Sequence, residues 1–123
     1  MKKQEMLDRF LDAGVRSLRI ANALPKDVLA KHVALQFFRA AASAGANHCE
    51  ACGAESSQDF AHKLQVVVKE LRETDFWVKL IARSGMIRAG RLKDFQDEAG
   101  QLTAICVASV KTLKSHRVSQ RRN

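Results

Sequence analysis

The side chains best suited to chemistry lie together near the middle of the sequence. Cys49 and Cys52 are three positions apart, and His48 precedes the first of them. Thiolate and imidazole are the usual zinc ligands, but a closed structural zinc site needs four. The remaining candidates are scattered along the chain: His32, His62, Cys106 and His116. Since buried cysteines commonly behave as small hydrophobes, we favour a packing role over metal or redox chemistry and expect no cofactor.

Catalytic patterns give little support for an enzyme. The sequence contains no Gly-rich phosphate loop, no nucleophile elbow and no pair of histidines four residues apart around a carboxylate. Glu70 and Glu73 share a helix face, as carboxylates of di-iron proteins do, but no Glu-x-x-His repeat accompanies them. We therefore expect a protein without catalytic activity.

Size and composition indicate one globular domain over residues 1–123. Hydrophobic residues make up 46% of the chain and charged residues 28%, with one Pro and no Tyr. No apolar run is long enough for a membrane span, and an odd count of 3 Cys favours reduced thiols, so we expect a cytoplasmic protein. The formal net charge of +8 favours acidic partners, nucleic acid first.

Apolar periodicity predicts four helices. The first has a core face of Leu7, Phe10, Leu11, Gly14, Leu18 and Ala21. The second runs from about Pro25 to Cys52 and ends before Gly53, since a proline suits a first helical turn and a glycine a helix end. In it a polar stripe recurs at helical spacing: Gln36, Arg39, Ser43, Asn47 and Glu50. Its other sides are small or apolar, so we expect it to be the most buried helix, with neighbours on several sides.

The third and fourth helices complete the fold. Ser56 and Asp59 predict a capping box before a helix that closes at Gly85, with the core face Phe60, Leu64, Val67, Leu71, Thr74, Val78 and Ile81. After a short connection, the fourth helix has the core face Leu92, Phe95, Ala99, Leu102, Cys106, Ser109 and Leu113. No stretch alternates with the period of a strand. The sequence thus predicts an all-α, antiparallel, up-and-down four-helix bundle.

Basic side chains gather in two regions. On the outer side of the third helix, Phe76 lies within an arc of Lys69, Arg72, Lys79 and Arg83. Beyond Ile105 the surface carries only basic charge, with Lys111, Lys114, Arg117, Arg121 and Arg122, and we expect the tail from about 115 to 123 to fray. Such residues can bind phosphates. A second interpretation makes Phe76, Trp77 and Leu80 an oligomer contact with the charges as its solvated rim.

The polar stripe also has two interpretations. The Arg39 guanidinium and the amides could grip a ligand or a nucleic-acid backbone. On a helix that is otherwise apolar, such residues more commonly bond to neighbouring helices and fix their register. We favour the structural role, with Glu70 and Glu73 as partners of Arg39.

An ordered set of residues resembles a known family. It consists of Leu24, Pro25, the polar stripe, Ser56, Asp59, Phe60, Glu73, Trp77 and Leu80. Over roughly residues 5 to 115 the chain is similar to bacterial four-helix-bundle proteins encoded within 23S ribosomal RNA intervening sequences. The resemblance implies a bundle that forms a ring-like homo-oligomer, a pentamer, without known catalytic activity. A related branch, the accessory proteins of diversity-generating retroelements, binds nucleic acid and a reverse transcriptase. The chain departs from the pattern with Ala51 after Glu50, where Gly is common.

Two functions follow as expectations. The first is an oligomer that binds RNA or DNA with little sequence specificity, as an accessory factor to ribosomal RNA intervening sequences or to a retroelement reverse transcriptase. The second is a protein-interaction scaffold whose charge only keeps it soluble. Salt dependence separates them, because counterions compete with phosphate binding and not with apolar docking.

Overall fold

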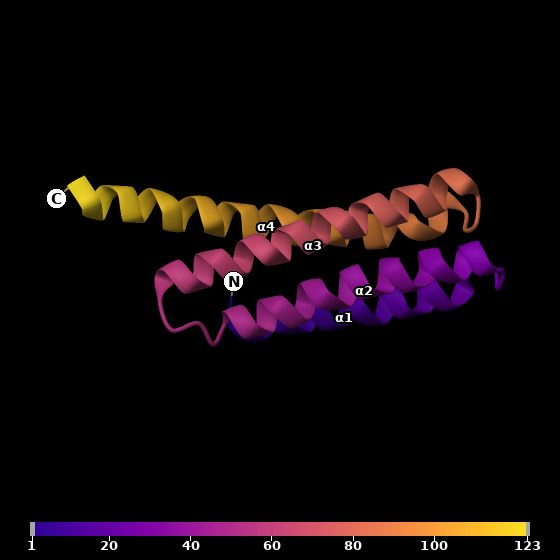
Figure 1. The fold of residues 1–123 in the computed structure, drawn as a ribbon, viewed down its shortest axis with the longest axis horizontal. Coiled ribbons are helices and arrows are strands. Elements are labelled where there is room, and N and C mark those ends of the chain that lie inside the picture. Colours follow the sequence, from indigo (N-terminus) through magenta and orange to yellow (C-terminus); the bar gives the residue numbers. More distant parts are fainter. Residues whose placement is uncertain (1, 123) are drawn as a thin grey trace.

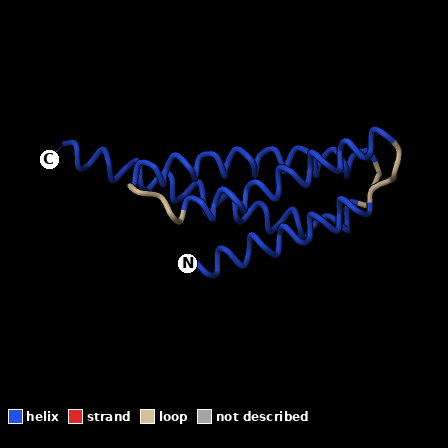
Figure 2. The backbone as a smooth tube through the Cα atoms, turned by 60° about the horizontal axis from the view of Figure 1, so that its bottom comes forward, coloured by secondary structure: helices blue, strands red, loops and turns tan. Residues whose placement is uncertain are grey.

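The protein is an antiparallel bundle of four helices (Figure 1). This computed structural model describes the backbone of residues 2–122 and the side chains of residues 2–116. The helices are α1 (Lys3–Ala23), α2 (Val28–Ala51), α3 (Ser57–Ser84) and α4 (Ala89–Arg122). The α1–α2 and α3–α4 loops lie at one end and the α2–α3 loop at the other, and the described backbone has no strand (Figure 2). The all-α, up-and-down bundle predicted from periodicity is confirmed.

Side-chain caps set the helix boundaries. Helix α2 begins three residues later than predicted, because Asp27 caps it by accepting a hydrogen bond from the Ala30 amide at 3.1 Å. Ser56 caps α3 as predicted, accepting from the Asp59 amide at 3.0 Å. Asp59 in turn accepts from the amide of Glu55 at 3.4 Å, not from that of Ser56. Gly85 ends α3 in the left-handed conformation with φ of 77°.

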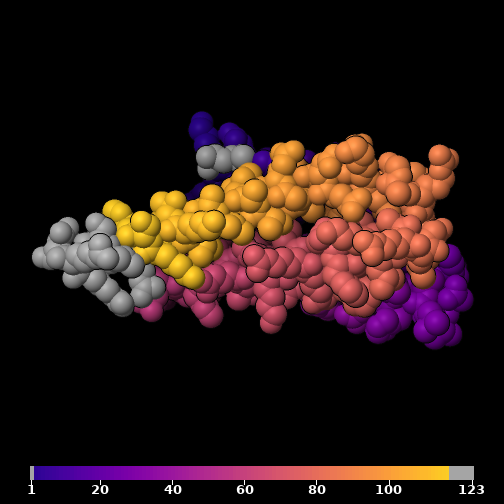
Figure 3. All heavy atoms as spheres, turned by 90° about the horizontal axis from the view of Figure 1, so that it is seen from above, coloured from indigo at the N-terminus to yellow at the C-terminus, as the bar shows by residue number. Residues whose placement is uncertain are grey.

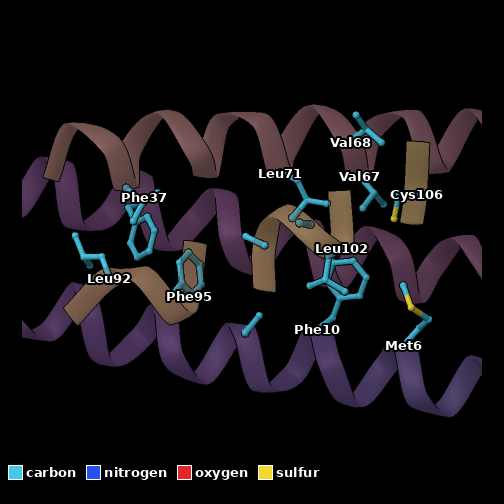
Figure 4. Close-up of a cluster of buried hydrophobic side chains, with 14 of the residues drawn as sticks. Met6, Phe10, Phe37, Val67, Val68, Leu71, Leu92, Phe95, Leu102 and Cys106 are labelled. Carbon is cyan, nitrogen blue, oxygen red and sulfur yellow. The ribbon is translucent and has the colours of Figure 1, made fainter. Parts of the chain in front are cut away.

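Helices α3 and α4 bury the faces that the sequence predicts. Six of the seven predicted α3 residues are buried, and Phe60 is partly buried. In α4, the five predicted core residues Leu92, Phe95, Ala99, Leu102 and Cys106 are buried, and Ser109 and Leu113 are partly buried. Figure 4 shows this core, where Phe37 of α2 meets Phe95 of α4 edge-on at 5.4 Å between ring centroids.

Helix α1 presents a different face to the core than predicted. Its buried residues are Met6, Phe10, Ala13 and Ser17. Of the predicted face, Phe10 is buried and Leu7, Gly14 and Ala21 are partly buried, but Leu11 is 57% exposed and Leu18 is 46% exposed. The buried face is rotated from the predicted one and keeps Phe10, which packs against α2 where the Gly45 hydrogen leaves it room. The prediction for α1 was therefore wrong by about one residue.

Helix α2 is also less enclosed than predicted. Its buried residues lie on one face: Ala30, Val33, Phe37, Ala40, Ala44, His48 and Ala51. On the opposite side Leu35 is 68% exposed, so the chain covers only one of the two apolar sides of α2. Helix α2 packs against both α1 and α3, and α3 packs against both α2 and α4, so the prediction that α2 is the most buried helix stays a prediction.

No described helix combines the length and the apolarity that crossing a bilayer requires.

Replacing Phe37 should test the core directly. Its side chain is fully buried, so Phe37→Ala should lower the free energy of unfolding by about 3–5 kcal/mol through lost burial and a cavity. Urea denaturation measures this difference. Phe76→Ala is the matched control, since Phe76 is 57% exposed. Equal effects of the two substitutions would contradict the assignment of Phe37 to the core.

Candidate nucleic-acid interface

The structure gathers four of the predicted basic residues around one groove between α3 and α4. Lys69 and Arg72 come from α3, and Lys111 and Lys114 come from α4. We call this hollow of about 400 Å³ the α3/α4 groove; its other lining residues are Gln65, Val68, Val107 and Val110. Figure 3 shows α3 and α4 side by side on this face of the molecule. Residues 45 positions apart in sequence thus form one cationic surface.

The cations of the α3/α4 groove form no ion pair with the described side chains, although Lys69 acts at longer range to lower the pKa of Glu73. Among the described side chains, no carboxylate lies within ion-pair distance of Lys69, Arg72, Lys111 or Lys114. All four are exposed, and their aliphatic stems lie near a valine-lined floor. Such a surface offers positive charge to phosphates and apolar area to sugars or bases.

The rest of the predicted arc lies around a separate hollow of about 500 Å³. It is lined by Phe76, Lys79, Leu80, Arg83 and Ser84. Lys79 forms an ion pair with Asp75 at 2.7 Å, which offsets part of the charge there. The predicted arc is therefore divided into two parts. The part with Lys69 and Arg72, which lies beside Lys111 and Lys114 of α4, carries the denser positive charge. The side chains of Arg117, Arg121 and Arg122 lie outside the described side chains. The described backbone of α4 is helical to Arg122, and the fraying expected from about residue 115 to 123 stays a prediction.

The three residues predicted as an oligomer contact occupy different environments. Phe76 projects away from the bundle and contacts Trp77 edge-on at 5.1 Å between centroids. Trp77 is partly buried at the α2–α3 seam, where it meets His32 edge-on at 6.3 Å and donates to Glu73 at 3.1 Å. Leu80 is also partly buried. An oligomer contact through these residues stays a prediction.

Arg39 of the polar stripe pairs across the α2–α3 seam, as predicted. Its guanidinium forms ion pairs with Glu73 and, at 3.4 Å, with Glu70. Hydrogen bonds from Trp77 and then from Arg39 hold the pKa of Glu73 below its usual range. The network links α2 and α3 at one position along their axes and so helps to fix the register between these two helices. Because Arg39 is half exposed, its effect on the free energy of unfolding is small.

The remaining stripe residues bond within α2 or face solvent. Gln36 accepts a long hydrogen bond from Arg39 at 3.4 Å. Asn47 donates to the Ser43 carbonyl at 2.8 Å and to its hydroxyl at 3.1 Å. Glu50 is exposed. Only Arg39 of the stripe thus has a polar contact to another helix among the described residues, which narrows the predicted register role to this one position.

The Cys and His residues near the end of α2 serve mainly in packing. His48 is buried and stacks on Phe10 at 4.8 Å between centroids, and burial lowers its pKa. Cys52 Sγ lies 4.0 Å from His48 Nδ1, whereas Cys49 is exposed. Within the described residues no three side chains of ligand type converge. Burial raises the pKa of the Cys106 thiol to about 11, so this thiol stays protonated.

Sequence reasoning missed two further surfaces. An apolar groove of about 460 Å³ lies between α1 and α2, with the exposed stripe of α1 on one side and Phe38, Ala42 and Ala46 on the other. We call it the α1/α2 groove. A third basic surface lies between α1 and α4 around Arg16, Arg19 and Arg91. The α1/α2 groove could have been predicted, because α1 carries two apolar stripes and only one of them can face the core. The basic surface between α1 and α4 depends on the register of these two helices, and no local sequence pattern indicates it.

Lowering the pH should destabilise the fold through His48. Unfolded histidine titrates near 6.5, and the folded-state pKa is lower. As pH falls below this value the unfolded state binds a proton that the buried ring does not, so the free energy of unfolding decreases until the folded pKa is reached. Urea denaturation between about pH 7.5 and about pH 5.5 should show this loss in the wild type and not in His48→Phe. His62→Gln, at an exposed site, should keep the wild-type pH dependence; an unchanged pH dependence in His48→Phe would contradict this origin.

Comparisons with known proteins agree with the fold. A solved structure from Bacteroides thetaiotaomicron, described as a protein of unknown function from the S23 ribosomal protein family, aligns with a TM-score of 0.79. It shares 26% sequence identity with this chain, and the alignment covers 86% of this chain and 98% of the other. No curated protein matches the chain. Residues 2–108 match the family described as 23S rRNA-intervening sequence protein, so the chain belongs to that family.

Proposed function

We propose that this protein is a non-enzymatic, cytoplasmic homo-oligomer that binds RNA or DNA with little sequence specificity. The observation that carries the proposal is the α3/α4 groove, where four cations that form no ion pair with the described side chains flank an apolar floor. The net charge of +8 adds a long-range attraction for a polyanion. The family description, which refers to 23S ribosomal RNA intervening sequences, points to the same class of partner.

Low sequence specificity follows from the kind of contact available. Lysine and arginine at the α3/α4 groove reach phosphates, which position a nucleic acid without reading its bases. The other lining side chains are three valines, which carry no hydrogen-bonding group for base edges, and Gln65, which supplies a single amide. The protein then acts as an accessory factor that holds a nucleic acid near an intervening sequence or near a reverse transcriptase.

Self-association is supported by the two sides of α2. One apolar side packs in the chain core, and the opposite side, with Leu35, is exposed. On this side of α2, Phe38, Ala42 and Ala46 line the α1/α2 groove together with the outward stripe of α1, and a second subunit would cover it. A ring needs two different surfaces on each subunit, because head-to-tail contacts are heterologous. Phe76 on α3 is an exposed apolar residue on a separate element and suits the second surface. The resemblance to the family adds the expectation of a pentamer.

The alternative function is a protein-interaction scaffold. The α1/α2 groove favours it, because an apolar groove can also hold a helix of another protein. In that case the cations would serve solubility, and binding of nucleic acid would be weak at every salt concentration.

The nucleic-acid proposal is tested by changing Lys69, Arg72, Lys111 and Lys114 together to Gln. Titration of labelled RNA and DNA at salt concentrations from about 50 to about 300 mM should show a log–log slope that is smaller by roughly 3–4 than in the wild type. The matched control changes Lys2, Lys3, Lys26 and Lys31 to Gln, which removes the same charge elsewhere. A separate variant changes Arg117, Arg121 and Arg122. Equal slopes for the groove variant and the control would contradict the α3/α4 groove as the interface, and absent wild-type binding at low salt would favour the scaffold.

The oligomer proposal is tested by Leu35→Glu. Leu35 lines a hollow next to the α1/α2 groove that shares Leu18 and Phe38 with it. A carboxylate at position 35 would be buried without a partner in an assembly through this face, so we expect sedimentation velocity to show smaller species. The protomer should keep its fold, since Leu35 is 68% exposed in the single chain. Gln58→Glu adds the same charge at an exposed α3 site and is the control. A wild-type protein that is monomeric at micromolar concentration would contradict self-association.

A further inference from the structure

A second basic groove lies between α1 and α4. Arg16 and Arg19 of α1 and Arg91 of α4 surround a hollow of about 350 Å³, which we call the α1/α4 groove. Ile20, Ile87 and Phe95 complete its apolar lining, and Asp94 is its one acidic residue. Three guanidinium groups therefore face one carboxylate, and the local charge is positive.

These three arginines have no ion-pair partner among the described side chains. Arg9, which lies on α1 like Arg16 and Arg19, differs from them because it forms an ion pair. It donates a hydrogen bond to Glu98 of α4 at 2.9 Å, and this bond lowers the pKa of the Glu98 carboxyl. Arg16 adds only a weaker, longer-range effect on the same carboxyl. Glu98 is thus occupied by Arg9, and the guanidinium groups of Arg16, Arg19 and Arg91 remain available to an external anion.

Arginine suits one class of anion in particular. The planar guanidinium donates two parallel hydrogen bonds to a phosphate or carboxylate, which a lysine ammonium cannot do. Three such groups around an apolar hollow match a chain of phosphates joined by sugars better than they match a single small anion. A nucleic-acid backbone supplies that pattern.

The two basic grooves lie on either side of α4, which packs against α3 along one side and touches α1 along another. Arg91 and Lys111 are 20 residues apart in this helix, which corresponds to about 30 Å along its axis. Because the two grooves open on different sides of α4, a nucleic acid that contacts both must cover this rise and also pass around the helix. A long nucleic acid can do so, whereas a short one cannot.

We propose that the α1/α4 groove is a second phosphate-binding site, and that each chain holds one nucleic acid at two points on either side of α4. This inference rests on the proposed function and adds a site, its ligand class and a minimum ligand length. Two linked contacts raise the affinity for long ligands more than for short ones, because the second contact forms at a high effective concentration.

The experiment compares four forms of the full chain: the wild type, the triple variant Arg16→Gln, Arg19→Gln and Arg91→Gln, the α3/α4 groove variant, and a charge-matched control. The control changes Lys2, Lys26 and Lys31 to Gln. Each is titrated with a labelled duplex of about 24 base pairs and with a hairpin whose stem has about six, over salt from about 50 to about 300 mM. All three arginines are exposed, so unchanged urea midpoints should show that the fold is intact.

The triple variant should reduce the salt slope on the long duplex by about 2–3 relative to the wild type, and the control should leave it nearly unchanged. On the short hairpin the loss should be clearly smaller. A triple variant that behaves like the control would overturn the second site and leave the α3/α4 groove in place. Equal losses on both ligands would overturn the two-point arrangement. Failure of the wild type to bind either ligand would overturn the proposed function itself, which separates the two conclusions.

Discussion

The apolar stripe of α3 is the constraint on which the rest of the bundle depends. It is continuous from Ala61 to Ile81 and packs against α2 along one flank and α4 along the other. Helix α1, in contrast, packs mainly against α2 and has few contacts with α4. A change in the α3 stripe would therefore affect every other helix, either directly or through α2. This central helix also carries Lys69 and Arg72, so the geometry of the α3/α4 groove depends on the same packing.

The α1–α4 edge is the weakest contact of the bundle, and polar bonds contribute much of it. Arg9 donates to Glu98 and to Gln101, the latter at 3.1 Å. Apolar burial along this edge is limited, because the two helices touch at few places. A partly exposed ion pair contributes little to the free energy of unfolding, about 0–1 kcal/mol. Its geometry nevertheless favours one position of α1 along α4, the one in which Arg9 reaches Glu98. That register brings Arg16 and Arg19 of α1 opposite Arg91 of α4.

The sequence predicted the α3 and α4 faces well and the α1 face poorly, for a physical reason. In α3 the apolar residues form one stripe, so only one rotation of the helix buries them. In α1 two neighbouring stripes compete, and the buried one contains Ala13 and Ser17, which look weak as core residues. Ser17 is accommodated because its hydroxyl donates to the Gly14 carbonyl at 2.7 Å. Packing against α2 decides which stripe of α1 enters the core. The sequence of α1 alone does not contain this information.

The candidate sites show the same division. The pairing of Arg39 with Glu70 and Glu73 could be predicted. These opposite charges lie on the polar faces of two helices that pack together, so they meet at the seam between the helices. The α3/α4 groove could be predicted only as two separate basic regions, because their meeting depends on how α4 slides along α3. The cap at Asp27 was missed because Pro25 offered an equally good start two residues earlier.

Gly14 shows how the needs of folding and of assembly differ in this chain. It lies in the middle of α1, where glycine weakens a helix by roughly 0.5–1 kcal/mol relative to alanine. Apart from the adjacent backbone of α1 itself, no atom lies within 4 Å of the position that a Cβ would take, so no packing contact in the described protomer requires a glycine there. The residue instead leaves a notch in the wall of the α1/α2 groove. In the proposed oligomer a side chain of a neighbouring subunit would fill this notch, and α1 would then become fully stable only on assembly.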